Sequence, residues 1–246
     1  MKLSRLQSDT SLNLVLLPGT GCDQQLWEKI LPSFPSHINL IFPDLGGGKS
    51  IDEMVSIVEQ LPYKNFALLG FSMGGYLAQV FFQRFPERVS HLILISASRR
   101  GYPERQKVRT QNLINQIENR IIDPTSISYL SRFVDLRSAE STQAFQTIEA
   151  MLRRIGIQGL THQMKATFDR KRLLAKPVKV SLACLLIGGR FDLVVPPSHL
   201  EELSRTFNTP VEWVNTGHMA PLEDPSSVGS LLNRFFQNGD QSGKRA

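Results

Sequence analysis

Short apolar runs alternate with amphipathic stretches in the first hundred residues of the chain. The apolar runs have the length of buried β-strands, and turn residues follow several of them. The strands predicted here are Leu12–Leu17, Ile38–Phe42, Phe66–Leu69 and Leu92–Ile95, with a helix at Gly75–Phe85. Buried strands separated by helices are typical of a parallel sheet with helices on both faces.

The pattern changes in the middle of the chain. From residue 99 to residue 176 there is no good strand run, and apolar residues recur at helical spacing in Val108–Ile117 and Ala144–Ile155. After this segment the pattern of the first part returns. The later strands are predicted at Leu182–Ile187 and Pro210–Val214, and the later helices at Ser198–Phe207 and Pro225–Phe236.

These changes in pattern divide the chain into a core and an insertion. We expect an α/β core made of residues 1–98 and 177–238, in which Leu3–Leu6 is a remnant of an opening strand. A helical cap is expected at residues 99–176, inserted into this core. Residues 239–246 are polar and without periodicity, so we expect a disordered tail.

The composition is that of an ordinary globular protein. The 246 residues are 41% hydrophobic and 20% charged, and no apolar run approaches the roughly 20 residues that span a bilayer. The first ten residues hold no apolar run of the kind found in a secretory signal, so we expect a cytoplasmic protein with no membrane partner. Cys22 and Cys184 are too few for a disulfide scaffold, and no cluster has metal-ligand spacing. We therefore expect no metal and no cofactor.

Positive charge is concentrated in the middle of the chain. The net charge is +6, but residues 99–179 hold 16 Lys and Arg against 7 Asp and Glu, a net of +9. This excess of positive charge could bind an anionic substrate. Changing Arg153 and Arg154 to glutamate would test that interpretation. No nucleic-acid motif accompanies the basic residues, so no nucleic acid is expected as a partner.

The strongest chemical motif is the stretch from Gly70 to Gly75, Gly-Phe-Ser-Met-Gly-Gly. It reads G-x-S-x-G, ends a predicted strand and opens a predicted helix, which is the context of a nucleophile elbow. In such a turn Ser72 is held in a strained backbone conformation and the glycines let neighbouring backbone approach. The structural alternative is a glycine-rich turn in which Ser72 only caps the helix.

A serine hydroxyl needs a base, and the chain has five histidines. His218 follows a late strand directly, which places it at the carboxyl edge of the sheet with Ser72. Asp192 follows the strand before it, after a glycine turn, and is the predicted acid that orients the imidazole. Glu223 and Asp224 are alternative acids, although both follow His218 and are expected at the N-terminus of a helix.

Two backbone N–H groups are predicted to stabilise a developing oxyanion. One belongs to Met73, the residue after the nucleophile. The other belongs to Thr20, in the loop after the first strand, where Gly19 and Gly21 allow close approach.

With these motifs in place, the sequence resembles the α/β-hydrolase superfamily over essentially its whole length. Leu17 to Gly21, followed by Trp27, resembles the family's His-Gly loop with Pro18 in place of the histidine. Residues 42–50, Phe-Pro-Asp-Leu-Gly-Gly-Gly-Lys-Ser, resemble its P-D-x-x-G-x-G-x-S turn, again without the histidine. Residues 188–192 and 217–218 match its G-x-x-D and G-H elements. Among subgroups the chain looks most like small bacterial carboxylesterases with a helical cap, including the pimeloyl-ester esterase type.

The resemblance implies an ester-hydrolysing enzyme that forms an acyl-enzyme on Ser72. The substrate would be a small-molecule ester or thioester, anionic or linked to acyl carrier protein or coenzyme A. Expected pocket residues are Phe71, Trp27 and the cap residues Phe133, Phe145, Met151 and Leu152. The same apparatus serves thioesterases, carbon–carbon hydrolases and lyases, and a non-enzymatic relative is a further alternative.

Overall fold

Six parallel strands form one sheet in the computed structural model, which describes residues 11–168, 170–173 and 182–242. The strands are β1 (Leu12–Leu17), β2 (Ile38–Ile41), β3 (Phe66–Phe71), β4 (Val89–Ile95), β5 (Ala183–Gly189) and β6 (Val211–Val214). Their order in the sheet is β2-β1-β3-β4-β5-β6, and every neighbouring pair is parallel. The predicted fold class is therefore confirmed.

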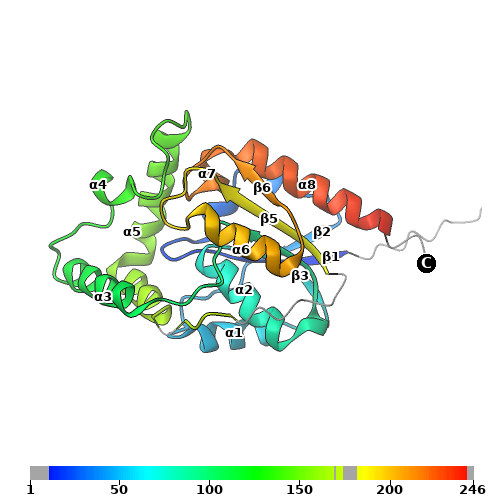
Figure 1. Ribbon diagram of the computed structural model, residues 1–246, viewed down its shortest axis with the longest axis horizontal. Coiled ribbons are helices and arrows are strands. Elements are labelled where there is room, and N and C mark those ends of the chain that lie inside the picture. The colour runs from blue at the N-terminus through cyan, green and yellow to red at the C-terminus, as the bar shows by residue number, and fades with distance from the viewer. Residues whose placement is uncertain (1–10, 169, 174–181, 243–246) are drawn as a thin grey trace, which may run out of the picture.

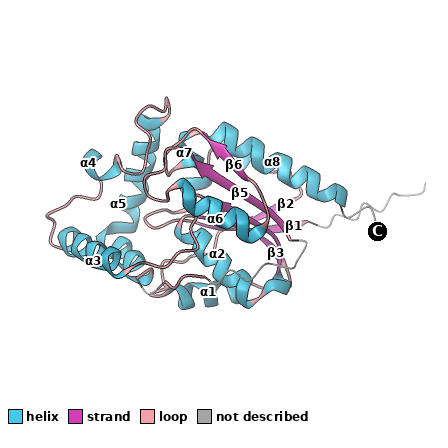
Figure 2. Ribbon diagram, viewed as in Figure 1, coloured by secondary structure: helices cyan, strands magenta, loops and turns pink. Residues whose placement is uncertain are grey.

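Helices cover both faces of this sheet (Figures 1 and 2). The helices are α1 (Ile51–Glu59), α2 (Met73–Arg84), α3 (Glu104–Glu118), α4 (Ile127–Leu130), α5 (Ser141–Ala166), α6 (Pro197–Phe207), α7 (Ala220–Glu223) and α8 (Pro225–Ser242). Three 3₁₀ helices are η1 (Gln24–Trp27), η2 (Leu31–Ser33) and η3 (Pro86–Arg88). Helices α1, α2 and α6 lie on one face, and α8 lies on the other.

Alternate side chains of the buried strands supply two separate layers of core. In β1, Leu14 and Leu16 pack on the face covered by α8, whereas Val15 and Leu17 pack on the face covered by α1 and α2. All four side chains are fully buried. A strand segment buried on both faces has no polar side, which explains the continuous apolar run Leu14–Leu17.

Helices α3, α4 and α5 lie between β4 and β5 in the chain and sit beyond the carboxyl ends of the strands (Figure 1). We call the described residues of this segment, 99–168 and 170–173, the inserted segment. Helix α5 is kinked at Gly156, whose φ of 70° interrupts the helical backbone. Residues 174–181 and the predicted remnant strand Leu3–Leu6 lie outside the described residues.

The last helix is longer than the sequence indicates. Helix α8 continues to Ser242 and so includes residues 239–242, which the sequence assigns to a disordered tail. Once a helix is anchored by buried side chains such as Phe236, each further residue gains a hydrogen bond at little cost. Residues 243–246 lie outside the described part of the chain. Within that part, no helix combines the length and apolar character needed to cross a membrane.

The turn between β3 and α2 depends on glycine. A Cβ atom on Gly74 would lie 2.0 Å from the carbonyl oxygen of Leu17, and one on Gly70 would lie 2.4 Å from the carbonyl oxygen of Gly74. Backbone is packed against backbone here, so no side chain can move aside. This contact holds the start of α2 against the end of β1.

We predict that Gly74→Ala lowers the free energy of unfolding by about 2–3 kcal/mol or prevents folding, because its methyl group has no space. Gly47→Ala is the matched control, since a Cβ at Gly47 meets no atom within 4 Å. Urea unfolding of both variants measures the difference. Equal stability of the two variants would contradict the packing described.

Candidate active site

The structure brings Ser72, His218 and Asp192 together at the carboxyl edge of the sheet. The three residues follow β3, β6 and β5 respectively, and these strands end at the same edge because they are parallel. His218 Nε2 lies 3.0 Å from Ser72 Oγ, and His218 Nδ1 lies 2.8 Å from Asp192 Oδ2. Asp192 and His218 are buried, whereas Ser72 is partly exposed.

The backbone of Ser72 is strained in the way a nucleophile elbow requires. Its φ is 51° and its ψ is −111°, in a region that residues other than glycine rarely adopt. The backbone N–H of Ser72 donates to the carbonyl of Ile95 at 3.0 Å, and its carbonyl accepts from Tyr76 N–H at 3.1 Å. These contacts with β4 and α2 hold the hydroxyl above the sheet edge. Ser72 makes no side-chain cap with α2.

Both oxygens of Asp192 have partners. Oδ1 accepts the backbone N–H groups of Val194 and Val195, each at 2.8 Å, and Oδ2 faces His218. This arrangement favours the tautomer in which His218 carries a proton on Nδ1 and donates it to Asp192. Nε2 is then unprotonated and can accept the proton of Ser72 Oγ.

Glu223, one of the alternative acids, binds backbone N–H groups and not the imidazole. Its carboxylate accepts backbone N–H groups on both sides of His218, from Gly217 at 2.9 Å and Met219 at 2.9 Å. It also accepts the N–H of Asp135 at 2.7 Å, and burial raises the pKa of its carboxyl group. Glu223 therefore ties the loop that carries His218 to the inserted segment.

The inserted segment contacts this loop directly as well. The carbonyl of Phe133 accepts the N–H groups of His218 at 2.8 Å and Met219 at 3.2 Å. The imidazole of His218 is enclosed by two rings, with ring centroids 5.0 Å away for Phe71 and 6.3 Å away for Phe133. Access to the imidazole is thus limited on these sides.

Thr20 and Met73, the predicted oxyanion donors, are neighbours in the structure. The hydroxyl of Thr20 donates to the sulfur of Met73 at 3.4 Å. Met73 is the first residue of α2, so its backbone N–H has no acceptor within the helix. The adjacent Gly21 has a φ of 73° and donates its N–H at 2.8 Å to Oε1 of Gln163, a residue of α5. Helix α5 thereby holds the loop of Thr20.

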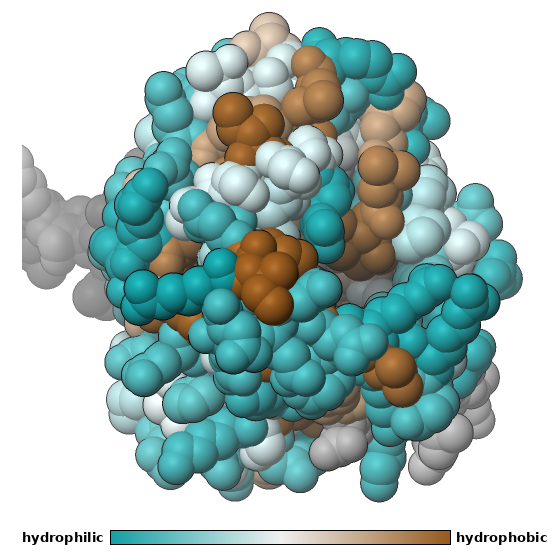
Figure 3. Space-filling model, turned by 90° about the vertical axis from the view of Figure 1, so that its left-hand side faces the viewer, coloured by the Kyte–Doolittle hydropathy of each residue, from teal (hydrophilic) through white to brown (hydrophobic). Residues whose placement is uncertain are grey.

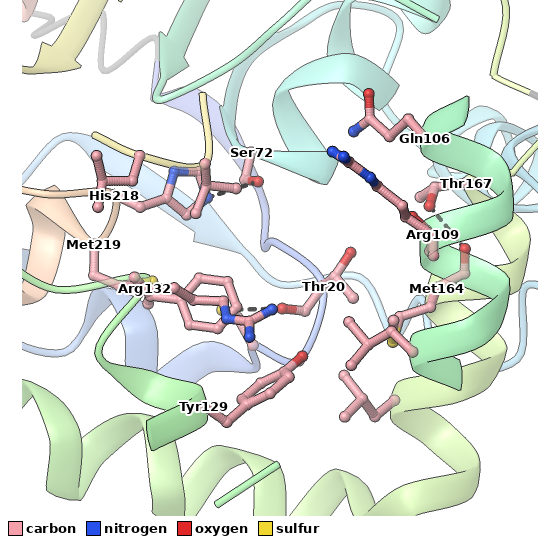
Figure 4. A pocket seen from close by; sticks show the side chains of 18 of the residues that line it. Thr20, Ser72, Gln106, Arg109, Tyr129, Arg132, Met164, Thr167, His218 and Met219 are labelled. Carbon is pink, nitrogen blue, oxygen red and sulfur yellow. Dashed lines mark hydrogen bonds between the residues drawn. The ribbon is translucent and has the colours of Figure 1, made fainter. Parts of the chain in front are cut away.

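Ser72, His218 and Thr20 line a cavity of about 830 Å³ beneath the inserted segment (Figure 4). Phe71, Phe133 and Leu152 line it as the sequence leads us to expect. The outer face over this region is mainly hydrophilic, with separate apolar patches (Figure 3). At the edge of the cavity, Leu193 and Val194 are exposed.

Three of the expected pocket residues lie elsewhere. Trp27 is fully buried and borders a second cavity of about 690 Å³, because η1 turns its indole into the core below the loop. Phe145, in the first part of α5, packs against the hydrophobic core. Met151 is fully buried, and its sulfur accepts the N–H of Asp23. Trp27, Phe145 and Met151 are thus not among the residues that line the Ser72 cavity, and a part for them in substrate binding stays a prediction.

Cys22 borders the Ser72 cavity but is a poor candidate for chemistry. Burial raises the pKa of its thiol to about 12, so it stays protonated at neutral pH. Among the residues that the structure describes, no three His, Cys, Asp or Glu side chains gather closely enough to hold a metal ion.

Comparison with known proteins identifies the family. The model of the α/β-hydrolase fold family matches residues 13–225. The chain belongs to the α/β-hydrolase fold family. Among its relatives, this α/β-hydrolase is 25% identical to a pimeloyl-[acyl-carrier protein] methyl ester esterase of Aliivibrio salmonicida, over 93% of this chain and 94% of that one. It is 31% identical to the AB hydrolase superfamily protein YisY of Bacillus subtilis, over 75% and 71% of the two chains.

Solved structures show the same fold. A thermophilic esterase from Thermogutta terrifontis superimposes on this α/β-hydrolase with a TM-score of 0.82 at 20% identity, covering 93% of this chain and 90% of that one. The enol-lactonase of Burkholderia xenovorans gives a TM-score of 0.80 at 16% identity, over 92% of each chain.

We predict that Glu223→Gln lowers the free energy of unfolding by about 1–3 kcal/mol, because an amide nitrogen cannot accept the N–H that one carboxylate oxygen now accepts. Thermal unfolding measures the loss. Glu53→Gln is a control of the same chemistry at an exposed residue of α1, where the carboxylate accepts one backbone N–H from Lys49. A Glu223→Gln variant no less stable than that control would show that the three hydrogen bonds do not hold the His218 loop.

Proposed function

We propose that the protein is a serine hydrolase that cleaves carboxylic esters through an acyl-enzyme on Ser72. The observation that carries this proposal is the chain of two short contacts, 3.0 Å and 2.8 Å, from Ser72 through His218 to Asp192. The positive φ of Ser72 and the cavity that opens on its hydroxyl support the same reading. Relatives named as esterases support ester chemistry.

In the proposed mechanism, Ser72 Oγ attacks the ester carbonyl carbon while His218 Nε2 takes the hydroxyl proton. The carbonyl oxygen becomes an oxyanion, and the N–H groups of Thr20 and Met73 stabilise it. The tetrahedral intermediate collapses with loss of the alcohol, which leaves with the proton from His218. Asp192 stabilises the imidazolium in between.

A water molecule completes the cycle. His218 takes a proton from the water as its oxygen attacks the acyl-enzyme carbonyl. The second tetrahedral intermediate releases the carboxylic acid and returns the proton to Ser72. The aromatic side chains of Phe71 and Phe133, which flank the imidazole, keep bulk solvent away from this proton transfer.

We further propose that the ester belongs to an anionic or carrier-linked small molecule. The net charge of the segment 99–179 and the relatives named pimeloyl-[acyl-carrier protein] methyl ester esterase support this. Thioester hydrolysis and carbon–carbon bond cleavage use the same groups and are the alternative activities. The cap character of the inserted segment, a cytoplasmic location and the absence of nucleic-acid and membrane partners stay predictions.

We predict that the wild-type enzyme hydrolyses p-nitrophenyl esters between acetate and decanoate and that Ser72→Ala lowers kcat at least about 10³-fold, because the nucleophile is gone. Asp192→Asn should lower kcat by a similar order, because an amide favours the wrong imidazole tautomer. Initial rates at 405 nm measure both effects. Hydrolysis by Ser72→Ala at the wild-type rate would contradict the mechanism.

A further inference from the structure

Most basic side chains of the inserted segment have acidic or carbonyl partners. Arg100 and Arg172 both pair with Glu202, and Arg99 donates to the Leu173 carbonyl. Further pairs join Lys107 with Glu104, Arg137 with Asp135, Arg153 with Glu149, Arg154 with Asp23, and Lys165 with Glu118. The local acids therefore offset much of the charge that makes this segment basic.

Arginines that line the Ser72 cavity are different. Arg105, Arg109 and Arg132 border the cavity, and none of them forms an ion pair with any residue in the described part of the chain. No Asp or Glu lines this cavity in the same part of the chain. Three positive charges, all on solvent-exposed side chains, thus border a space whose described lining holds no carboxylate. Such a space attracts an anion.

Two of these arginines enter the cavity from opposite sides (Figure 4). Arg109 extends from α3 toward Ser72, and Arg132 extends from the residues after α4. The guanidinium carbon of Arg132 lies 4.7 Å from the ring centroid of Tyr129. Stacking of this kind orients a guanidinium while leaving the N–H donors at its edge available to a ligand.

The rest of the wall is suited to a hydrocarbon chain. Leu113, Ile148, Leu152, Leu160 and Met164 line the same cavity as the arginines and Ser72. A molecule that places its ester at Ser72 and an anionic group at the arginines would lie in the same cavity as this apolar surface. A planar guanidinium binds a carboxylate with two parallel hydrogen bonds.

We propose that Arg105, Arg109 and Arg132 form a carboxylate-binding subsite, and that the preferred substrates are small esters carrying a free carboxylate away from the scissile bond. This inference rests on the proposed function of Ser72. The subsite is more specific than a general attraction of anions by the basic segment. Arg153 and Arg154, the pair that the sequence suggests first, do not line this cavity. They form ion pairs with Glu149 and Asp23.

The test compares charged and neutral esters of matched length. In one arm, methanol release from monomethyl adipate is compared with release from methyl hexanoate, which places the carboxylate on the acyl side. In a second arm, acetate release from 6-acetoxyhexanoate is compared with release from hexyl acetate, which places it on the alcohol side. For each pair, the ratio of kcat/KM for the charged ester to kcat/KM for the neutral ester is the measured quantity.

For the wild type, we expect the charged-to-neutral ratio of kcat/KM to exceed one in one of the two arms. The arm in which it does so identifies the half of the substrate, acyl or alcohol, that carries the carboxylate. In Arg109→Gln/Arg132→Gln that ratio should fall by about 10- to 100-fold, since a hydrogen bond to a charged group is lost. Arg153→Gln is the control, because it removes a positive charge from the same segment outside the cavity. It should keep the wild-type ratio.

Three outcomes would overturn the inference. Ratios of one or below in both arms, with the neutral esters hydrolysed, would refute the subsite and leave the proposed function intact. An equal fall in Arg153→Gln and in the double variant would show a general field effect instead of a contact. Failure of the wild type to cleave any of the four esters would remove the proposed ester hydrolysis and the subsite together.

Discussion

Backbone contact between the start of α2 and the end of β1 is the constraint on which the site depends. The Cα of Gly74 lies so close to the Leu17 carbonyl that no side chain fits between them. This contact brings the first turn of α2 next to the loop that holds Thr20. It also fixes the turn in which Ser72 adopts a positive φ. The strain at Ser72 is maintained because two strands and a helix hold the turn on all sides.

Hydrogen bonds from the inserted segment then hold the two loops that complete the site. Phe133 and Asp135 bind the His218 loop, the latter through Glu223, while Gln163 binds the loop of Thr20 through Gly21. The inserted segment therefore does more than cover the cavity, since its residues contact both loops. Because Gln163 is a residue of α5, a movement of α5 would disturb the position of the Thr20 loop.

Much of the core and the main reactive groups could be predicted because their signals are local. The run Leu14–Leu17 is buried on both faces, and Ser72, Asp192 and His218 each lie within a few residues of the end of a strand. Helix α1 was not predicted, although Ser50 caps it by accepting the N–H of Glu53, a signal that the spacing of Ser and Glu offers.

Which residues line a pocket depends on tertiary packing, and local sequence patterns do not predict that packing. Trp27 and Phe145 have the size and polarity of pocket residues, but the directions of η1 and α5 turn them into the core. The arginines show the same limit. Arg153 and Arg109 look alike in the sequence. Glu149, one helical turn away, pairs with Arg153, whereas Arg109 borders a cavity whose described lining holds no acid.

Reaction with a fluorophosphonate followed by peptide mass spectrometry tests the central claim, an activated Ser72, most directly. Serine attack on phosphorus displaces fluoride and needs the nucleophile and its base but no knowledge of the natural substrate. The account predicts one adduct per chain, on the peptide that contains Ser72. An unmodified protein, or an adduct confined to another residue, would contradict it.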